Sequence, residues 1–332
     1  MKILLVGAAG AIARSLARRL QADGHDVVGI DRRPWAASPI EFHQVDVRKR
    51  GAEEVFRKLR PDAVVHTATV TSLVVPGAEE RSQINVAGTR AVFDYARAYG
   101  VEHCIFVGRH TFYGAGDESP LFHTEDEPPM ALNRFPELAD LVAADLYAGT
   151  ALWRFPELTT SVLRACYTLG PSGHGTLASF LRGKRVPMVI GFDPLFQFMH
   201  EDDLVAAIVL TLEVRPRGVF NVAGPQPLPL SRVIVGVGRT PLPLPEFVVK
   251  ATFGRFGLPK LPPGSLGHVK YPVVVDAGAF REHTGFSHTY DEVQTLGAYR
   301  EAFPPPDDAG HAGHAERPRS PHRARSSVFK RN

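Results

Sequence analysis

The chain has 332 residues and a net charge of +3, but residues 307–332 hold six Lys and Arg against three Asp and Glu, so residues 1–306 carry 32 of each and are neutral. A neutral body argues against nucleic acid as the main partner. No apolar run approaches the roughly 18 residues that a membrane helix needs, and two cysteines without a signal-like N-terminus lead us to expect a reducing cytoplasm.

The first 31 residues have the pattern of a strand, a glycine turn, a helix and a second strand. An apolar run at residues 3–6 enters Gly7-Ala8-Ala9-Gly10, and a helical stripe of apolar residues follows before the next run at residues 27–30. Gly7 allows a tight turn, and Gly10 lets a pyrophosphate approach the positive end of the helix. Asp31 closes the second strand, where it can accept hydrogen bonds from ribose hydroxyls. The predicted dinucleotide contacts in this unit are Gly7, Gly10, Ala11, Ile12, Asp31 and Arg32.

Strands and helices alternate through the rest of the first half. We expect strands at residues 42–45, 63–66, 104–108 and 161–165, and helices at 51–59 and 79–99. This alternation predicts an α/β fold with a doubly wound parallel sheet. Beyond residue 171 the pattern loosens into a helix at 203–212, a strand at 219–222 and a proline-rich stretch. We therefore expect a dinucleotide-binding domain at 1–165, a smaller substrate lobe at 166–303 that is partly interleaved with it, and a disordered basic tail at 304–332.

The glycine spacing resembles that of one family. Gly7, Gly10 and Ala13 follow G-x-x-G-x-x-G/A, as in the extended short-chain dehydrogenases/reductases, which include NAD-dependent epimerases and dehydratases. Over about residues 1–300 the resemblance implies a Rossmann-type domain and NAD as cofactor. Asp31 favours NAD, while NADP stays open as the alternative because of Arg32 and Arg33. The further cofactor contacts that the resemblance implies are Asp46 and Val47 at the adenine, His66, Thr67 and Ala68 in a loop along the cofactor, and Asn85 in an Asn-x-x-Gly-Thr motif.

The catalytic motif of this family is missing from the sequence. Members that move hydrides use Tyr-x-x-x-Lys, in which the lysine lowers the tyrosine's pKa, but none of the eight tyrosines here has a lysine four residues on. Matching Asp145 to a helix glutamate of the family puts Glu137 and Leu141 at the two positions. Arg109 stands where a Ser or Thr belongs. The candidate catalytic residues, chosen by their place after the fifth strand, are Arg109, Thr111 and Tyr113; otherwise they are a polar lining of the cleft.

Two departures concern the substrate. Tyr167 replaces an asparagine of the family's substrate pocket, and Phe196 replaces the arginine that grips the diphosphate of a nucleotide sugar. The motif containing Phe196 continues with His200, which we interpret as a structural residue before a capped helix. We expect an oxidoreductase of the epimerase/dehydratase type with an atypical active site, acting on a small molecule other than an ordinary nucleotide sugar. The alternative is a non-catalytic dinucleotide-binding sensor or scaffold. We expect no metal site, no membrane contact, and a homodimer as the candidate assembly.

Overall fold

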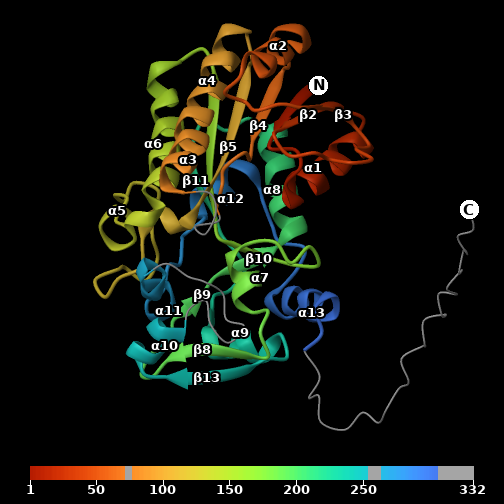
Figure 1. Ribbon diagram of the computed structural model, residues 1–332. Helices are drawn as coiled ribbons and strands as arrows, with labels where there is room; N and C mark the ends of the chain where they lie inside the picture. Colours follow the sequence, from red (N-terminus) through yellow and green to blue (C-terminus); the bar gives the residue numbers. More distant parts are fainter. Residues whose placement is uncertain (72–76, 253–262, 306–332) are drawn as a thin grey trace, which may run out of the picture.

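The computed structural model describes residues 1–71, 77–252 and 263–305, and it is organised around a seven-stranded parallel sheet (Figure 1). The order of strands is β11-β6-β5-β4-β1-β2-β3. This confirms the doubly wound α/β fold, with the order reversing between β1 and β4. The strands of the sheet are β1 (Lys2–Val6), β2 (Asp26–Asp31), β3 (Glu41–Gln44), β4 (Ala63–His66), β5 (His103–Arg109), β6 (Thr159–Ala165) and β11 (Gly218–Val222).

Helices cover both faces of the sheet, which explains why β1 is apolar throughout instead of alternating. Ile3 and Leu5 face one core and Leu4 and Val6 the other, because successive side chains of a strand point to opposite faces. The helices of the first face are α1 (Ala11–Ala22), α8 (Glu201–Val214) and α12 (Gly278–Thr284). Those of the second are α2 (Arg50–Leu59), α4 (Gly88–Ala98) and α6 (Ala139–Arg154). In both layers the apolar stripe of each helix supplies the buried contacts.

A smaller lobe is built from the second half of the chain and has its own apolar core (Figure 1). Its strands form three two-stranded sheets, β10–β7, β12–β9 and β13–β8. Pro241 and Pro243 stand within β13, which pairs with β8 alone. Because β13 has no second neighbouring strand, the N–H groups that the prolines lack are not needed for hydrogen bonds on that side. The strands are β7 (Tyr167–Leu169), β8 (Arg185–Val189), β9 (Leu195–Phe196), β10 (Phe198–His200), β12 (Leu228–Pro229) and β13 (Thr240–Leu244). The remaining helices outside the sheet layers are α5 (Ala131–Arg134), α7 (Thr176–Phe180), α9 (Leu230–Gly236), α10 (Glu246–Thr252), α11 (Gly267–Lys270) and α13 (Glu292–Ala302).

The sequence and the structure differ in two places that matter for the site. The helix expected at 79–99 is α3 (Ala78–Ser82), a π-helical turn (Gln83–Ala87) and then α4. The sheet also takes its last strand, β11, from residues beyond the predicted domain boundary at 165. Residues 306–332 of the predicted tail lie outside the described residues. No helix in the described ranges is long and apolar enough to span a bilayer.

Candidate functional site

A cleft of about 420 Å³ lies at the carboxyl ends of the central strands, between the sheet and the smaller lobe. Its position beside β1 and β4 is the point where ligands bind in open α/β sheets, since the strand order reverses there. The predicted cofactor residues that line it are Gly7, Gly10, Ala11, Ile12, Asp31, Arg32, Asp46, Val47, Thr67 and Ala68. The cleft continues past them to Arg109, Tyr167 and His174.

The turn between β1 and α1 is shaped for close approach to an anion. Gly7 has a φ of +91°, and a Cβ there would lie 2.7 Å from the backbone nitrogen of Ala68, so only glycine fits. Gly10 precedes α1 in an extended conformation and supplies no side-chain cap. The N–H groups of the first turn of α1 are therefore left for a ligand, at the positive end of a 12-residue helix. This geometry suits a pyrophosphate.

Two carboxylates stand at the adenosine end of the cleft, and each is held by an arginine. Asp31 is 8% exposed; its Oδ2 accepts a hydrogen bond from the N–H of Ala9 at 3.0 Å, and its Oδ1 accepts from the N–H of Arg33 at 2.8 Å. The Arg33 guanidinium lies 3.3 Å from the same carboxylate. A hydrogen bond from Arg48 lowers the pKa of Asp46. Both groups are thus placed to accept hydrogen bonds from sugar hydroxyls or an adenine amino group.

His66 and Asn85 do not line the cleft, although both were predicted to contact the cofactor. Both side chains are fully buried. His66 Nε2 lies 2.9 Å from the Thr89 hydroxyl, and its Nδ1 accepts from the N–H of Ala68 at 3.3 Å. Asn85 accepts from the N–H of Val70 at 2.7 Å and donates to its carbonyl at 3.1 Å. These two side chains brace both ends of the loop that lines the cleft, so their role toward a cofactor is indirect.

Of the three candidate catalytic residues, two line the cleft and one does not. Arg109 ends β5, and Thr111 lies in the 3-10 turn His110–Tyr113 that follows; both side chains line the cleft and are partly exposed. Tyr113, at the other end of the same turn, is fully buried and lines neither the cleft nor the smaller cavity beside it. A tyrosine without access to a ligand cannot exchange a proton with it. The prediction for Tyr113 is therefore wrong, because the 3-10 turn directs its ring away from the cleft.

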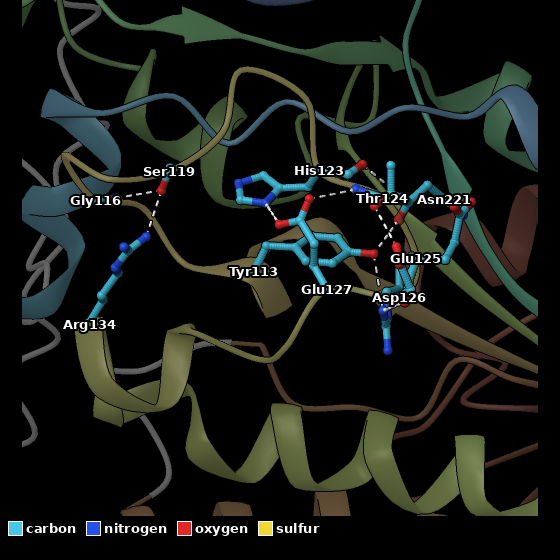
Figure 2. A network of polar contacts seen from close by, with 11 residues as sticks. Tyr113, Gly116, Ser119, His123, Thr124, Glu125, Asp126, Glu127, Arg134 and Asn221 are labelled. Carbon is cyan, nitrogen blue, oxygen red and sulfur yellow. Dashed lines mark hydrogen bonds and ion pairs between the residues drawn. The ribbon is translucent and has the colours of Figure 1, made fainter.

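Figure 2 shows the network of polar contacts to which the Tyr113 hydroxyl belongs. The hydroxyl donates to Asn221 Oδ1 at 2.7 Å and accepts from Arg164 Nη1 at 3.0 Å. Its ring stacks on His123 with centroids 4.9 Å apart, and His123 Nδ1 lies 2.6 Å from a Glu127 oxygen. Tyr113 thus belongs to a buried polar network that joins β6, β11 and the loop at residues 116–127, a structural role.

The positions matched to the family's Tyr/Lys pair carry no equivalent chemistry. Leu141 lines a second cavity of about 20 Å³ that also touches Thr111 and Arg109. Glu137 precedes α6 in a 3-10 turn and lines neither cavity. Asp145 does face the small cavity, but its carboxylate accepts three hydrogen bonds from Arg164, the shortest at 2.8 Å. Among the described residues no lysine lines either cavity, and Tyr167 is the one tyrosine that does.

Tyr167 and Phe196 form one aromatic stack, of which only Tyr167 reaches the cleft. The ring centroids lie 5.7 Å apart, and Phe196 is 7% exposed behind its partner. Burial raises the pKa of Tyr167 to about 12, so its hydroxyl is a hydrogen-bond donor at neutral pH. The edge of the His110 ring meets Tyr167 with centroids 4.3 Å apart. Phe196 thus lies outside the cleft and supports the ring of Tyr167, which lines it.

Several lining residues escaped prediction. His174 lies at the rim, where desolvation and the positive charges of Arg109 and Arg33 lower its pKa. The glycines at positions 170, 173 and 175 marked a loop after β7, but nothing in their pattern indicated which side of it would face the cleft. His110 is 2% exposed and lines the cleft; its Nδ1 bonds the carbonyl of Ala165 at 3.1 Å, while its Nε2 has no partner. His200 caps α8 by accepting from the N–H of Asp202, as predicted.

Comparison with known proteins agrees with this site. Residues 3–223 match the model of the NAD dependent epimerase/dehydratase family. The chain belongs to this family. The match ends one residue after β11, so it covers the whole sheet together with the stretch that contains Tyr167 and His200. The resemblance to extended short-chain dehydrogenases/reductases is thereby confirmed.

Individual relatives are distant. An uncharacterized protein of Mycobacterium tuberculosis is 27% identical over 267 residues, which are 78% of this chain and 70% of that protein. A Streptomyces protein named 3-diazoavenalumate denitrifying reductase is 26% identical over 284 residues, 77% of this chain and 88% of its own. Among solved structures, the Thermus thermophilus UDP-glucose 4-epimerase in complex with NAD has a TM-score of 0.73 and 22% identity, covering 91% of this chain and 99% of that one. At this identity the likeness shows the fold.

Proposed function

We propose that this protein binds NAD in the cleft and uses it for hydride transfer on a small molecule, with an active site that departs from the family's Tyr/Lys pair. The observation that carries the proposal is the joining of the Gly7–Gly10 turn, the bare first turn of α1 and the Asp31 carboxylate in one cleft. These groups match the pyrophosphate and the ribose of a dinucleotide. The named relatives that are crystallised with NAD support the same cofactor.

The described residues offer groups that fit each part of such a cofactor. When bound, NAD supplies a hydride acceptor or donor at its nicotinamide ring. Gly10 and the N–H groups that follow it would hold the pyrophosphate, and Asp31 the adenosine ribose. The loop braced by His66 and Asn85 would keep Thr67 and Ala68 against the cofactor. Those two bracing residues thus act on binding through the loop.

Proton transfer would fall to the polar groups at the far end of the cleft. Thr111 and Tyr167 line it with hydroxyl groups, and His110 offers an unpartnered ring nitrogen. Because Nδ1 of His110 can only donate to the Ala165 carbonyl, the neutral ring presents Nε2 as an acceptor. Among the residues that the structure describes, no lysine lines the cleft beside these groups to lower their pKa. We therefore expect the chemistry to differ from that of a sugar epimerase.

We also propose a substrate other than an ordinary nucleotide sugar. Phe196 offers no charge to a diphosphate, and its ring is committed to the stack with Tyr167. A relative at 26% identity is named as a reductase of 3-diazoavenalumate, which supports a wider range of substrates among related chains. The alternative of a non-catalytic sensor or scaffold is favoured by one observation, the leucine at position 141 beside the catalytic cavity.

The deciding experiment has two parts. Calorimetric titration of the purified chain with NAD tests the cofactor site, and a crystal of that complex would show which side chains lie beside nicotinamide C4. Reduction of NAD or oxidation of NADH, followed at 340 nm against a panel of small hydroxy and carbonyl compounds, then separates an enzyme from a sensor. Failure to bind NAD would refute the proposal.

The oligomeric state and the cellular location of the protein are also part of the proposal. The outer side of α6 exposes Leu146 by 42% and Trp153 by 86%, a surface that a second copy of the chain could cover. We propose a homodimer through this helix. Cys104 and Cys166 are both buried and unpaired, which supports the expected cytoplasmic location.

A further inference from the structure

Arg109 is a cation without a counterion at the substrate end of the cleft. It ends β5 and lines both cavities. Among the described residues no hydrogen bond or ion pair reaches its guanidinium, although the acids at the other end of the cleft, Asp31 and Asp46, each have an arginine partner. Asp145, the carboxylate that lines the smaller cavity together with Arg109, is paired with Arg164. Desolvation lowers the pKa of Arg109; the interaction with Tyr167 acts in the opposite direction, and no carboxylate does so.

An uncompensated charge of this kind costs free energy in the folded protein, and proteins keep such costs mainly at functional sites. A guanidinium does not lose its proton at neutral pH, so the charge is present whenever the cleft is empty. An anionic group on a bound ligand would compensate this charge.

The surroundings limit which anion fits. His110 and His174 are the other basic side chains that line this end of the cleft. Burial lowers the pKa of His110 to about 3, and desolvation and the charges of Arg109 and Arg33 lower that of His174, so both are neutral near pH 7. The cleft therefore offers a single positive charge there, which matches a monoanion better than a phosphate dianion. Tyr167 interacts electrostatically with Arg109, and its hydroxyl has no partner among the described residues, so it is a second donor. A planar guanidinium fork matches the two oxygens of a carboxylate.

We propose that the substrate carries a carboxylate, and that Arg109 binds it with the Tyr167 hydroxyl as a second donor. This inference rests on the proposed function for its place in the reaction. The anion is distinct from the cofactor's pyrophosphate, because β5 lies two strands from β1 in the order β5-β4-β1. At roughly 4.8 Å per strand, the end of β5 is about 10 Å from the Gly7 turn.

Benzoate tests the proposal, with benzamide as its neutral isostere, since the ring can lie against Tyr167. Both are titrated by calorimetry into the full-length chain, with and without NAD. The wild type should bind benzoate at least tenfold more tightly than benzamide, as expected for one charged hydrogen-bonded contact. Arg109→Gln should abolish this preference, Tyr167→Phe should reduce it, and Arg109→Lys should retain part of it.

Arg90→Gln is the matched control, because Arg90 is an exposed arginine of α4 that pairs with Asp94 and lines neither cavity. It should leave the benzoate preference unchanged. Arg109→Gln should also unfold at the same temperature as the wild type or higher, because no protein partner is lost. An unchanged preference in Arg109→Gln, or no benzoate binding by the wild type, would overturn the carboxylate site. NAD titration of the wild type and of every variant is recorded separately, so failure of the wild type to bind NAD refutes the cofactor proposal alone.

Discussion

Three buried histidines make the stability of this fold depend on pH well above the range where carboxylates titrate. His66, His103 and His110 are at most 2% exposed. Burial lowers the pKa of His66 and His110 to about 3 and that of His103 to about 4, from an ordinary 6.5. The hydrogen bonds of His66 show why: its Nδ1 accepts from the N–H of Ala68, and a proton there would face another proton.

The sign follows from linkage. In the unfolded chain each imidazole binds a proton below pH 6.5, while the folded chain excludes it, so the stability is fully present above 6.5 and falls as the pH falls toward 4. Between pH 7.5 and 5.5, proton binding to each histidine of the unfolded chain raises the equilibrium constant of unfolding by a factor of about ten, which is about 1.4 kcal/mol. Three histidines together lower the free energy of unfolding by about 4 kcal/mol, a large part of the typical 5–15 kcal/mol.

Urea unfolding followed by the fluorescence of the buried Trp35, at pH 7.5, 6.5 and 5.5, measures this loss. His103 lies away from the cleft and bonds Ser161 through Nε2, so His103→Gln should keep a donor and reduce the loss by about one third. His43→Gln is the control, because the His43 side chain is 42% exposed. A free energy of unfolding that changes by less than 1 kcal/mol between pH 7.5 and 5.5 would refute the reasoning, as would equal slopes for the wild type and His103→Gln.

Three further predictions concern cofactor, substrate and assembly. NAD should bind more tightly than NADP, and Asp31→Asn, which keeps an acceptor for the Ala9 N–H but removes the charge, should shift the ratio of the two dissociation constants toward NADP by about tenfold. Calorimetry decides this, and an unchanged ratio would contradict it. Interconversion of UDP-glucose and UDP-galactose, measured by chromatography, should be slower than in sugar epimerases by about 10²–10⁴-fold, because no lowered-pKa tyrosine lines the cleft; ordinary epimerase rates would be the contrary result. Trp153→Glu should halve the molar mass measured by light scattering, because it places a charge in the proposed dimer interface. A wild type that is already monomeric would refute the proposed dimer.

The parts of the site that the sequence predicted well are local in the chain. The Gly7 turn, the stripe of α1 and Asp31 lie within 31 residues, so spacing alone determines which of them meet. The motifs placed His66 and Asn85 at the cofactor, but in the structure both hold the backbone of the loop that lines the cleft. Their role could not be read from the sequence, because a short polar side chain can bond a ligand or the backbone of the loop that holds it.

The prediction for Tyr113 was wrong because the direction of a side chain in an irregular turn does not follow from any periodicity of the sequence. Thr111 and Tyr113 are two residues apart, and a 3-10 turn sends one to the cleft and the other into the buried network with Asn221. The smaller lobe was predicted, but the strands within it were not, for a different reason. Its strands pair across long separations, as β8 does with the proline-containing β13, and two-stranded sheets leave little alternation to detect.

The position of β11 has a consequence for how the protein is made. The sheet ends on a strand that is synthesised more than 50 residues after its neighbour β6. Until residue 222 has left the ribosome, β6 presents a bare edge of unpaired N–H and C=O groups, and the face that α8 covers stays open. A nascent chain stopped at residue 165 is therefore an aggregation-prone species, and folding of the cofactor domain waits for translation to pass the first strands of the other lobe.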